Sequence, residues 1–239
     1  MAVGLAAGLL SMVAFASSSG AASSAAKGSA GVQEAASCTG NVVLDPGHVG
    51  TDSGAVNKTY NLTEKDQNLK VAYILRDKLN SAGYTVCMTR GGGDPNVAGD
   101  EDNAADDATL LNSDRYTFAN TTGAKVLVSI HMNGSTNPAT DYTTTLFGKW
   151  KKDKALAQTV FQSLSTLPAA NDPSKTIATR TPYSYASGVL LKSNMPATIA
   201  ETVFITSNDE ARLLSAGTRQ QQIADALKAG IIKYLPKTS

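Results

Sequence analysis

The stretch VVLDPGHVGTDSGA, residues 42–55, ends an apolar run with Asp-Pro-Gly and then places a histidine among glycines. The run predicts a buried strand that stops at a sharp turn, because proline lacks the N–H that a strand ladder needs and glycine tolerates positive φ. In open α/β sheets, ligands bind beyond the carboxyl ends of the strands. His48 is one of only two histidines in the chain, and its position makes it a candidate functional residue.

Strand-like and helical segments alternate along the rest of the chain. Strands are expected at residues 42–44, 84–90, 125–131, 188–191 and 197–205, and helices at 64–82, 111–121, 155–164 and 218–234. Strands that alternate with helices of about ten residues or more indicate a mostly parallel sheet covered on both faces. We therefore expect an α/β fold: a single domain with a mostly parallel twisted sheet of about six strands and helices on both faces.

Length and composition fit one folded domain. The chain has 239 residues, of which 42% are hydrophobic and 17% charged, enough for one substantial core but hardly for two. The formal net charge is +1. A net charge so close to zero provides no general electrostatic attraction to polyanions. We therefore expect no nucleic-acid partner.

The first 39 residues are expected to lie outside that domain. Residues 1–26 carry no charged side chain, and their apolar part, residues 3–16, is too short to cross a bilayer comfortably. Small residues follow it, which indicates a secretory signal peptide region with AFA, residues 14–16, as a candidate cleavage site. A disordered Ala/Ser tail is the alternative. Residues 27–39 form a Ser/Ala/Gly linker, so the domain is expected at residues 40–236, exported and without a stable membrane span.

The second histidine suggests a metal site. His131 ends the apolar segment KVLVSIH, and turn-forming residues follow. The carboxyl ends of parallel strands share one edge, so His48 and His131 are expected to converge there, and Glu64 at the opening of the next helix supplies a third ligand. Two imidazoles and a carboxylate, with a fourth position left to water, are the ligands of a catalytic zinc site. The alternative is that Glu64 caps its helix in a capping box with Asn61.

Glu201 is a candidate general base. It interrupts the apolar strand PATIAETVFI, where a carboxylate is costly unless a charged group lies nearby. A zinc ion would be such a group. A carboxylate beside a zinc-bound water can take its proton as the water attacks a carbonyl, and then pass that proton to the leaving amine. The alternative is a buried salt bridge with Arg115 or Arg90.

The order of these segments resembles the zinc-dependent N-acetylmuramoyl-L-alanine amidases of the amidase-3 family. The matching segments are LDPGHVG with His48, LTEKDQNL with Glu64, VSIHMN with His131 and MPATIAETVFITSNDE with Glu201. The resemblance covers about residues 41–235. It implies that the two histidines and Glu64 bind one Zn²⁺, and that Glu201 is the catalytic base for cleavage of the amide between N-acetylmuramic acid and the L-alanine of the stem peptide.

This resemblance implies a place of action and a partner. We expect a secreted peptidoglycan hydrolase in the bacterial cell wall or a periplasm-like compartment, acting as a monomer on peptidoglycan or muropeptides. A related secreted zinc peptidase acting on stem-peptide bonds, and a non-catalytic wall-binding module, are the alternatives. Some members of the family carry a helix that covers the zinc between the second histidine and the catalytic glutamate. Residues 132–200 contain a single helix candidate here, so we expect an open site.

Two remaining features concern stability and the surface. Cys38 and Cys87 are the only cysteines, and an even pair in an exported protein favours a disulfide over two free thiols. Residues 91–107 form a long acidic segment where relatives have only a few residues. Because the EF-hand spacing is absent, a solvated loop is expected there and not a calcium site.

Overall fold

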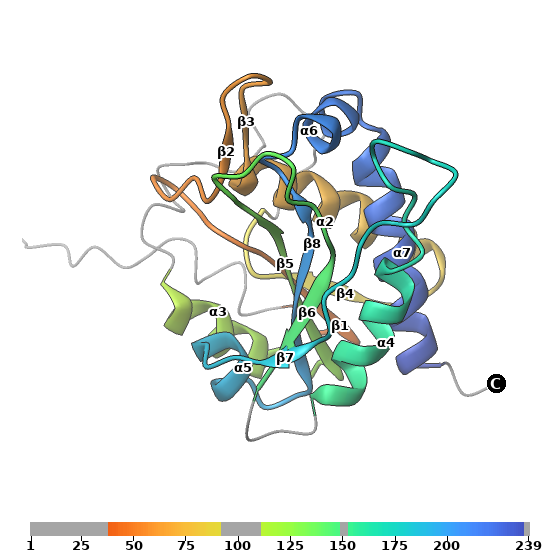
Figure 1. The fold of residues 1–239 in the computed structure, drawn as a ribbon. Coiled ribbons are helices and arrows are strands. Elements are labelled where there is room, and N and C mark those ends of the chain that lie inside the picture. Colours follow the sequence, from red (N-terminus) through yellow and green to blue (C-terminus); the bar gives the residue numbers. More distant parts are fainter. Residues whose placement is uncertain (1–37, 92–110, 149–152, 237–239) are drawn as a thin grey trace, which may run out of the picture.

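A computed structural model describes residues 38–91, 111–148 and 153–236 of the chain (Figure 1). Its six-stranded sheet consists, in spatial order, of β4 (Val86–Met88), β1 (Val42–Pro46), β5 (Val126–Asn133), β8 (Ala197–Phe204), β6 (Thr144–Phe147) and β7 (Tyr183–Ser184). Neighbouring strands run parallel except β8 and β6, which are antiparallel. The predicted mostly parallel sheet is therefore confirmed, and the antiparallel β6 starts at the edge where β1, β5 and β8 end.

Helices cover both faces of this sheet, as predicted. The helices α2 (Glu64–Ser81), α4 (Lys154–Leu164) and α7 (Thr218–Tyr234) lie on one face, and α3 (Asn112–Thr121) and α5 (Gly188–Lys192) on the other (Figure 1). Successive side chains of β5 point into different cores, because side chains alternate between the two faces of a strand. Leu127 packs with Leu190 in the smaller core, whereas Val128 packs with Leu75 and Leu227 in the larger one.

The remaining elements lie close to the carboxyl edge of the sheet. A hairpin of β2 (Val56–Asn57) and β3 (Leu62–Thr63) precedes α2, and α6 (Asn208–Ser215) follows β8. The buried Asn57 side chain donates to the Ile205 carbonyl at 3.0 Å and to Asn208 Oδ1 at 3.2 Å. These bonds fix the hairpin against the end of β8 and the start of α6.

One predicted strand is wrong. Residues 188–191, Gly-Val-Leu-Leu, begin the helix α5, in which Val189 and Leu190 are buried and the Leu191 N–H bonds to the Ser187 carbonyl. A short apolar run is compatible with either a buried strand or a buried helix, because four residues are too few to show a helical or a strand period. The strand next to β8 is instead β6, which the apolar pattern did not reveal because it contains buried threonines. The Thr145 hydroxyl donates to the Ala157 carbonyl, whereas the buried Thr144 hydroxyl has no partner among the described residues.

A disulfide joins Cys38 to Cys87 in β4, with 5.9 Å between the two Cα atoms. This confirms the favoured pairing and excludes free thiols. The proposed signal peptide region, all but the last two residues of the linker, and the acidic segment beyond Gly91 lie outside the described residues. Within the described ranges, no helix combines the length and apolar character that a membrane span requires.

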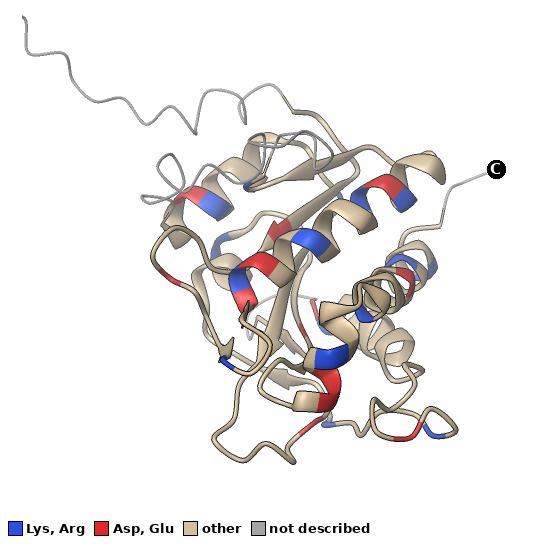
Figure 2. Ribbon diagram, turned by 90° about the horizontal axis from the view of Figure 1, so that it is seen from above, with Lys and Arg blue, Asp and Glu red and all other residues tan. Residues whose placement is uncertain are grey.

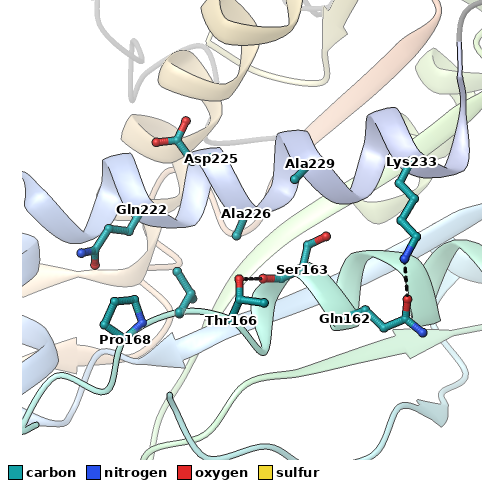
Figure 3. A pocket seen from close by; sticks show the side chains of 10 residues that line it. Gln162, Ser163, Thr166, Pro168, Gln222, Asp225, Ala226, Ala229 and Lys233 are labelled. Atoms are coloured by element: carbon teal, nitrogen blue, oxygen red, sulfur yellow. Dashed lines mark hydrogen bonds between the residues drawn. The ribbon is translucent and has the colours of Figure 1, made fainter. Parts of the chain in front are cut away.

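The surface carries no dominant charge. Figure 2 shows basic and acidic positions interspersed along the helices, in keeping with the net charge of +1. A groove of about 580 Å³ lies between α4 and α7, lined by both polar and apolar side chains that include Gln162, Gln222, Ala226 and Lys233 (Figure 3). Lys233 Nζ donates to Gln162 Oε1 across it at 3.0 Å. None of its lining residues is among the predicted site residues.

Candidate active site

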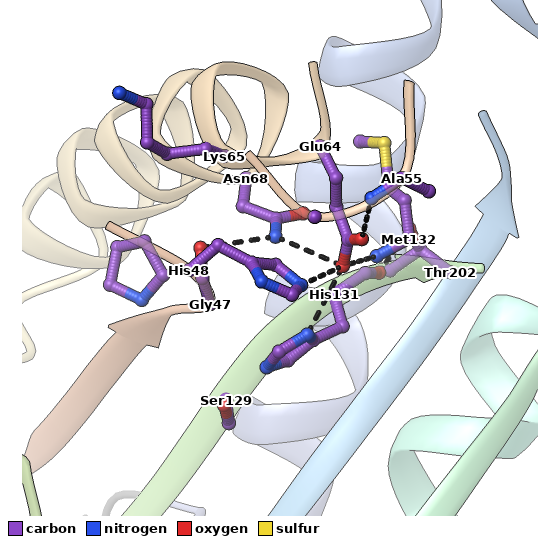
Figure 4. A network of polar contacts seen from close by, with 12 residues as sticks. Gly47, His48, Ala55, Glu64, Lys65, Asn68, Ser129, His131, Met132 and Thr202 are labelled. Atoms are coloured by element: carbon purple, nitrogen blue, oxygen red, sulfur yellow. Dashed lines mark hydrogen bonds and ion pairs between the residues drawn. The ribbon is translucent and has the colours of Figure 1, made fainter. Parts of the chain in front are cut away.

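His48, Glu64 and His131 meet at the carboxyl edge of the sheet, as predicted. His48 follows β1, His131 lies within β5 and Glu64 is the first residue of α2. One potential ligand atom from each lies within 4.8 Å of the others. Figure 4 shows both imidazoles directed at the Glu64 carboxylate, whose Oε1 is 2.9 Å from His48 Nε2 and 3.1 Å from His131 Nδ1.

The Glu64 carboxylate is fixed by the main chain as well. Its Oε2 accepts from the Ala55 N–H at 2.9 Å and its Oε1 from the Met132 N–H at 3.0 Å. Burial alone would raise the pKa of Glu64, but the hydrogen bonds and charges of His131 and His48 hold it well below its usual range. The helix is capped instead by Thr63, whose hydroxyl accepts from the Asp66 N–H. The capping-box role considered for Glu64 is therefore wrong.

Asp52 orients His48. Its Oδ2 lies 2.9 Å from His48 Nδ1, and this contact leaves Nε2 to face Glu64. Burial of His48 opposes protonation, but the hydrogen bond and charge of Glu64, with those of Asp52, raise its pKa to about 9. A carboxylate on the outer nitrogen of a metal-binding histidine fixes the tautomer and the ring orientation. The sequence analysis did not identify Asp52, although its place four residues after His48 in the same turn was available.

A buried ion pair supports the turn that carries His48. Arg115 Nη1 lies 2.6 Å from Asp45 Oδ1, and the same guanidinium donates to the carbonyls of Pro46 at 2.8 Å and His48 at 3.0 Å. His48 itself has a φ of 63°, a conformation that non-glycine residues rarely adopt unless the surroundings impose it. Arg115 is thus part of what holds His48 in place.

Two glycines leave room for the side chains of His131 and Glu64. A Cβ on Gly47 would overlap the His131 ring, and a Cβ on Gly54, whose φ is 62°, would lie 2.5 Å from Glu64 Oε2. Only glycine leaves this clearance. The converging donors fit a metal ion, since two imidazole nitrogens and one carboxylate oxygen are the protein ligands of catalytic zinc sites.

Glu201 lies beside the His48, Glu64 and His131 cluster. It pairs in register with His131 of β5 and with Thr144 of β6, so its side chain lies on the same face of the sheet as that of His131. Burial, with a further contribution from the negative charge of Glu64, raises the pKa of Glu201, whereas His131 opposes the rise.

The salt bridge considered for Glu201 is wrong. Arg115 pairs with Asp45, and Arg90 donates to the Pro46 carbonyl at 2.9 Å and to the Gly47 carbonyl at 3.0 Å. Among the described residues, no basic side chain forms an ion pair with Glu201. This partly buried carboxylate therefore faces the histidine and glutamate cluster, and no basic side chain of the described residues is paired with it.

A mostly parallel α/β sheet that brings two histidines and two glutamates to its carboxyl edge is the arrangement of a metal-dependent hydrolase. A family model described as N-acetylmuramoyl-L-alanine amidase, Amidase_3, matches residues 42–233. The chain belongs to this family, and the predicted enzyme class, a peptidoglycan-hydrolysing amidase, is confirmed.

Relatives match over most of this chain. N-acetylmuramoyl-L-alanine amidase AmiA of Escherichia coli K12 is 28% identical over 232 residues, which cover 81% of this chain and 75% of AmiA. The crystal structure of an N-acetylmuramoyl-L-alanine amidase from Clostridium difficile 630 is 30% identical with a TM-score of 0.66, covering 85% of this chain and 100% of that one. The amidase AmiC2 of Nostoc punctiforme is 29% identical with a TM-score of 0.67, covering 82% and 97%.

Proposed function

We propose that His48, Glu64 and His131 bind Zn²⁺ and that Glu201 is the general base in hydrolysis of the amide between N-acetylmuramic acid and L-alanine. The observation that carries this proposal is the convergence of three ligand atoms within 4.8 Å, with Glu201 in register beside His131. The ligand set also matches the chemistry of a catalytic zinc site, which needs three protein ligands and an open position.

Each residue then has a defined task in the reaction. Bound zinc supplies a Lewis acid that polarises the scissile carbonyl and makes water a nucleophile near neutral pH. Glu201 accepts a proton from the attacking water and donates it to the nitrogen of L-alanine as the C–N bond breaks. Burial favours the protonated form of its carboxyl after the first transfer, which helps it to act as the acid in the second. Asp52 keeps His48 Nε2 directed into the site.

The site is proposed to be open and active without an activator. Between His131 and Glu201 the described residues contain two helices, α4 and α5. Helix α4 packs on α7, β8 and β6, and helix α5 packs on α3 and β8. Each helix is therefore part of one of the two cores and does not cover the site. Hydrolysis by the isolated domain supports this proposal, whereas hydrolysis only after a partner protein is added contradicts it.

The chain is further proposed to be exported, with residues 1–26 as the signal peptide region and residues 27–39 as the linker, and to act as a monomer in the cell wall or a periplasm-like compartment. The supporting observations are the uncharged apolar start of the sequence and the disulfide at Cys38. N-terminal sequencing of the protein recovered from the culture medium tests the cleavage, and retention of residues 1–26 would contradict it.

Glu201→Gln tests the chemistry. The variant should keep its zinc and its melting temperature but lose about 10² to 10⁴ in turnover, because an amide cannot accept the proton. Asp77→Asn, an equivalent change on the exposed side of α2, is the control and should leave turnover unchanged. Zinc content, melting temperature and release of amine from a muropeptide are measured on one preparation. Normal turnover by Glu201→Gln would remove it from the mechanism.

The identity of the products separates the enzyme classes. An amidase frees the amino group of L-alanine, whereas a stem-peptide peptidase frees that of a later residue, and a wall-binding module frees none. Mass spectrometry of a defined muropeptide digest, with and without a chelator, distinguishes the three outcomes. Release of an amine other than that of L-alanine would contradict the proposed reaction and indicate a stem-peptide peptidase.

A further inference from the structure

An arginine lies two strands away from Glu201, on the same edge of the sheet. Residues 178–180 pair with the start of β6, since the Thr143 N–H donates to the Ala178 carbonyl at 2.9 Å and the Arg180 N–H to the Thr143 carbonyl at 3.0 Å. Because β6 is the neighbour of β8, the main chain at Arg180 is about 10 Å from that at Glu201, twice the usual strand spacing.

The pairing also fixes which face Arg180 occupies. Thr143 pairs with Thr179, and Thr144 pairs with Glu201. Side chains of neighbouring residues alternate between faces, and paired residues share a face. Arg180 therefore stands on the face of Glu201, where His131 also lies.

The Arg180 guanidinium is held by aromatic side chains. Its Cζ lies 5.0 Å from the centre of the Tyr183 ring, and Nη1 donates to the Tyr142 hydroxyl at 3.3 Å. The Tyr142 ring in turn packs edge-on against Phe204, with 4.6 Å between the ring centres. Tyr183 and Tyr185 are 37% and 51% exposed. These aromatic contacts hold the guanidinium at the exposed carboxyl edge of the sheet.

Among the described residues, Arg180 has no acidic partner. Arg76, Arg115 and Arg219 each pair with a carboxylate of the chain. Within the described ranges, Arg180 makes no ion pair, and its only side-chain hydrogen bond is the one to Tyr142. A guanidinium presents several N–H groups in a planar fork that matches a carboxylate, so the unused donors of Arg180 suit an incoming carboxylate.

We propose that Arg180, positioned by Tyr142 and Tyr183, binds a free carboxylate of the stem peptide on the amine side of the scissile bond. This inference rests on the proposed function. In the stem, L-alanine is followed by a glutamate joined onward through its side chain, which leaves its α-carboxylate free. That group lies about 7 Å beyond the scissile amide in an extended chain. Because the main chain at Arg180 is about 10 Å from that at Glu201, such a carboxylate comes within reach of the Arg180 guanidinium.

The test compares two muropeptides that differ in one group. One carries this glutamate with its free α-carboxylate, and the other carries the corresponding α-amide. For the wild-type protein, KM for the carboxylate form should be about tenfold lower, because a charge-assisted bond is lost in the amide form. Arg180→Gln should raise KM for the carboxylate form to that for the amide form and leave kcat unchanged, as expected for lost uniform binding.

Arg76→Gln is the matched control. Arg76 also lies 5.0 Å above a tyrosine ring, that of Tyr73, but it is 12 residues along α2 from Glu64, about 18 Å away. It should keep the wild-type preference, and Arg180→Lys should keep part of it. Equal KM values for both muropeptides in the wild type, or an unchanged preference in Arg180→Gln, would overturn the inference about Arg180 but not the proposed function. Hydrolysis of neither form by the wild type would instead overturn the proposed function on which it rests.

Discussion

At the residue scale, the exposed Asp52 is predicted to affect metal binding through its contact with His48. Its carboxylate is 67% exposed, yet it contacts His48 Nδ1 at 2.9 Å. Asp52→Ala should weaken zinc binding by about 10- to 100-fold, because the ring of His48 is no longer held in one tautomer and orientation. The melting temperature of the metal-free protein should change little, since the side chain buries almost nothing. Competition with a chromophoric chelator measures the affinity, with Asp77→Ala as control, and an unchanged affinity would contradict the role.

Gly47 matters because it has no side chain, which leaves space for the His131 ring. Gly47→Ala should remove zinc binding, since the added methyl group overlaps the ring of His131. Gly188→Ala is the matched control: the nearest atom to its added Cβ is in the Tyr116 ring at 3.4 Å, an ordinary contact. Metal content after dialysis against zinc distinguishes the two variants. Full occupancy in Gly47→Ala would show that His131 can move aside without loss.

Among the elements, β1, β5 and α3 are joined by one buried carboxylate. Asp45 in β1 accepts hydrogen bonds at 2.6 Å each from Arg115 of α3, Ser129 of β5 and Thr89, which follows β4. Burial would raise the pKa of Asp45, but the Arg115 charge and these hydrogen bonds lower it to about 2. Since the folded-state pKa is depressed, the ionised group stabilises the fold above the unfolded-state pKa of 3.8.

This stabilisation, about 2 kcal/mol, should disappear as the pH falls from about 4 to 2. Asp45→Asn should lose this part of the acid sensitivity and should be less stable by about 3 to 5 kcal/mol at neutral pH, because buried Arg115 is left unpaired. Urea unfolding of both proteins at several pH values isolates the contribution of this one group. Parallel pH profiles for the two proteins would contradict the assignment.

The elements that sequence reasoning found are those with long, regular patterns. α2 and α7 have buried residues at helical spacing and were predicted within one residue of their ends, and β1, β5 and β8 follow from continuous apolar runs. The two histidines and Glu64 could be singled out because the sequence places them at a strand end or a helix start, and Glu201 because it interrupts an apolar strand. Arg180 could not, since its segment is polar and its pairing with β6 exists only in the tertiary structure.

At the scale of the whole molecule, the disulfide ties the start of the domain to the sheet. It spans 49 positions of the sequence, so by loop entropy it should contribute about 4 kcal/mol. Reduction of the wild type and the Cys38→Ser, Cys87→Ser double variant should lower the unfolding free energy by similar amounts. Both forms should still bind zinc, because Cys87 pairs with Val43 near the start of β1, whereas His48 follows the other end of that strand. Equal stability with and without the disulfide in urea titrations would contradict this estimate.

The lengths of the strands also bear on how copies of this protein meet one another. The outermost strands of the six-stranded sheet, β4 and β7, contain only three and two residues, whereas β5 and β8 in the interior contain eight each. An edge so short offers few open backbone groups to a second sheet, and short edges are one way in which natural proteins avoid edge-to-edge aggregation. The concentrated enzyme should consequently resist the growth of intermolecular β-structure.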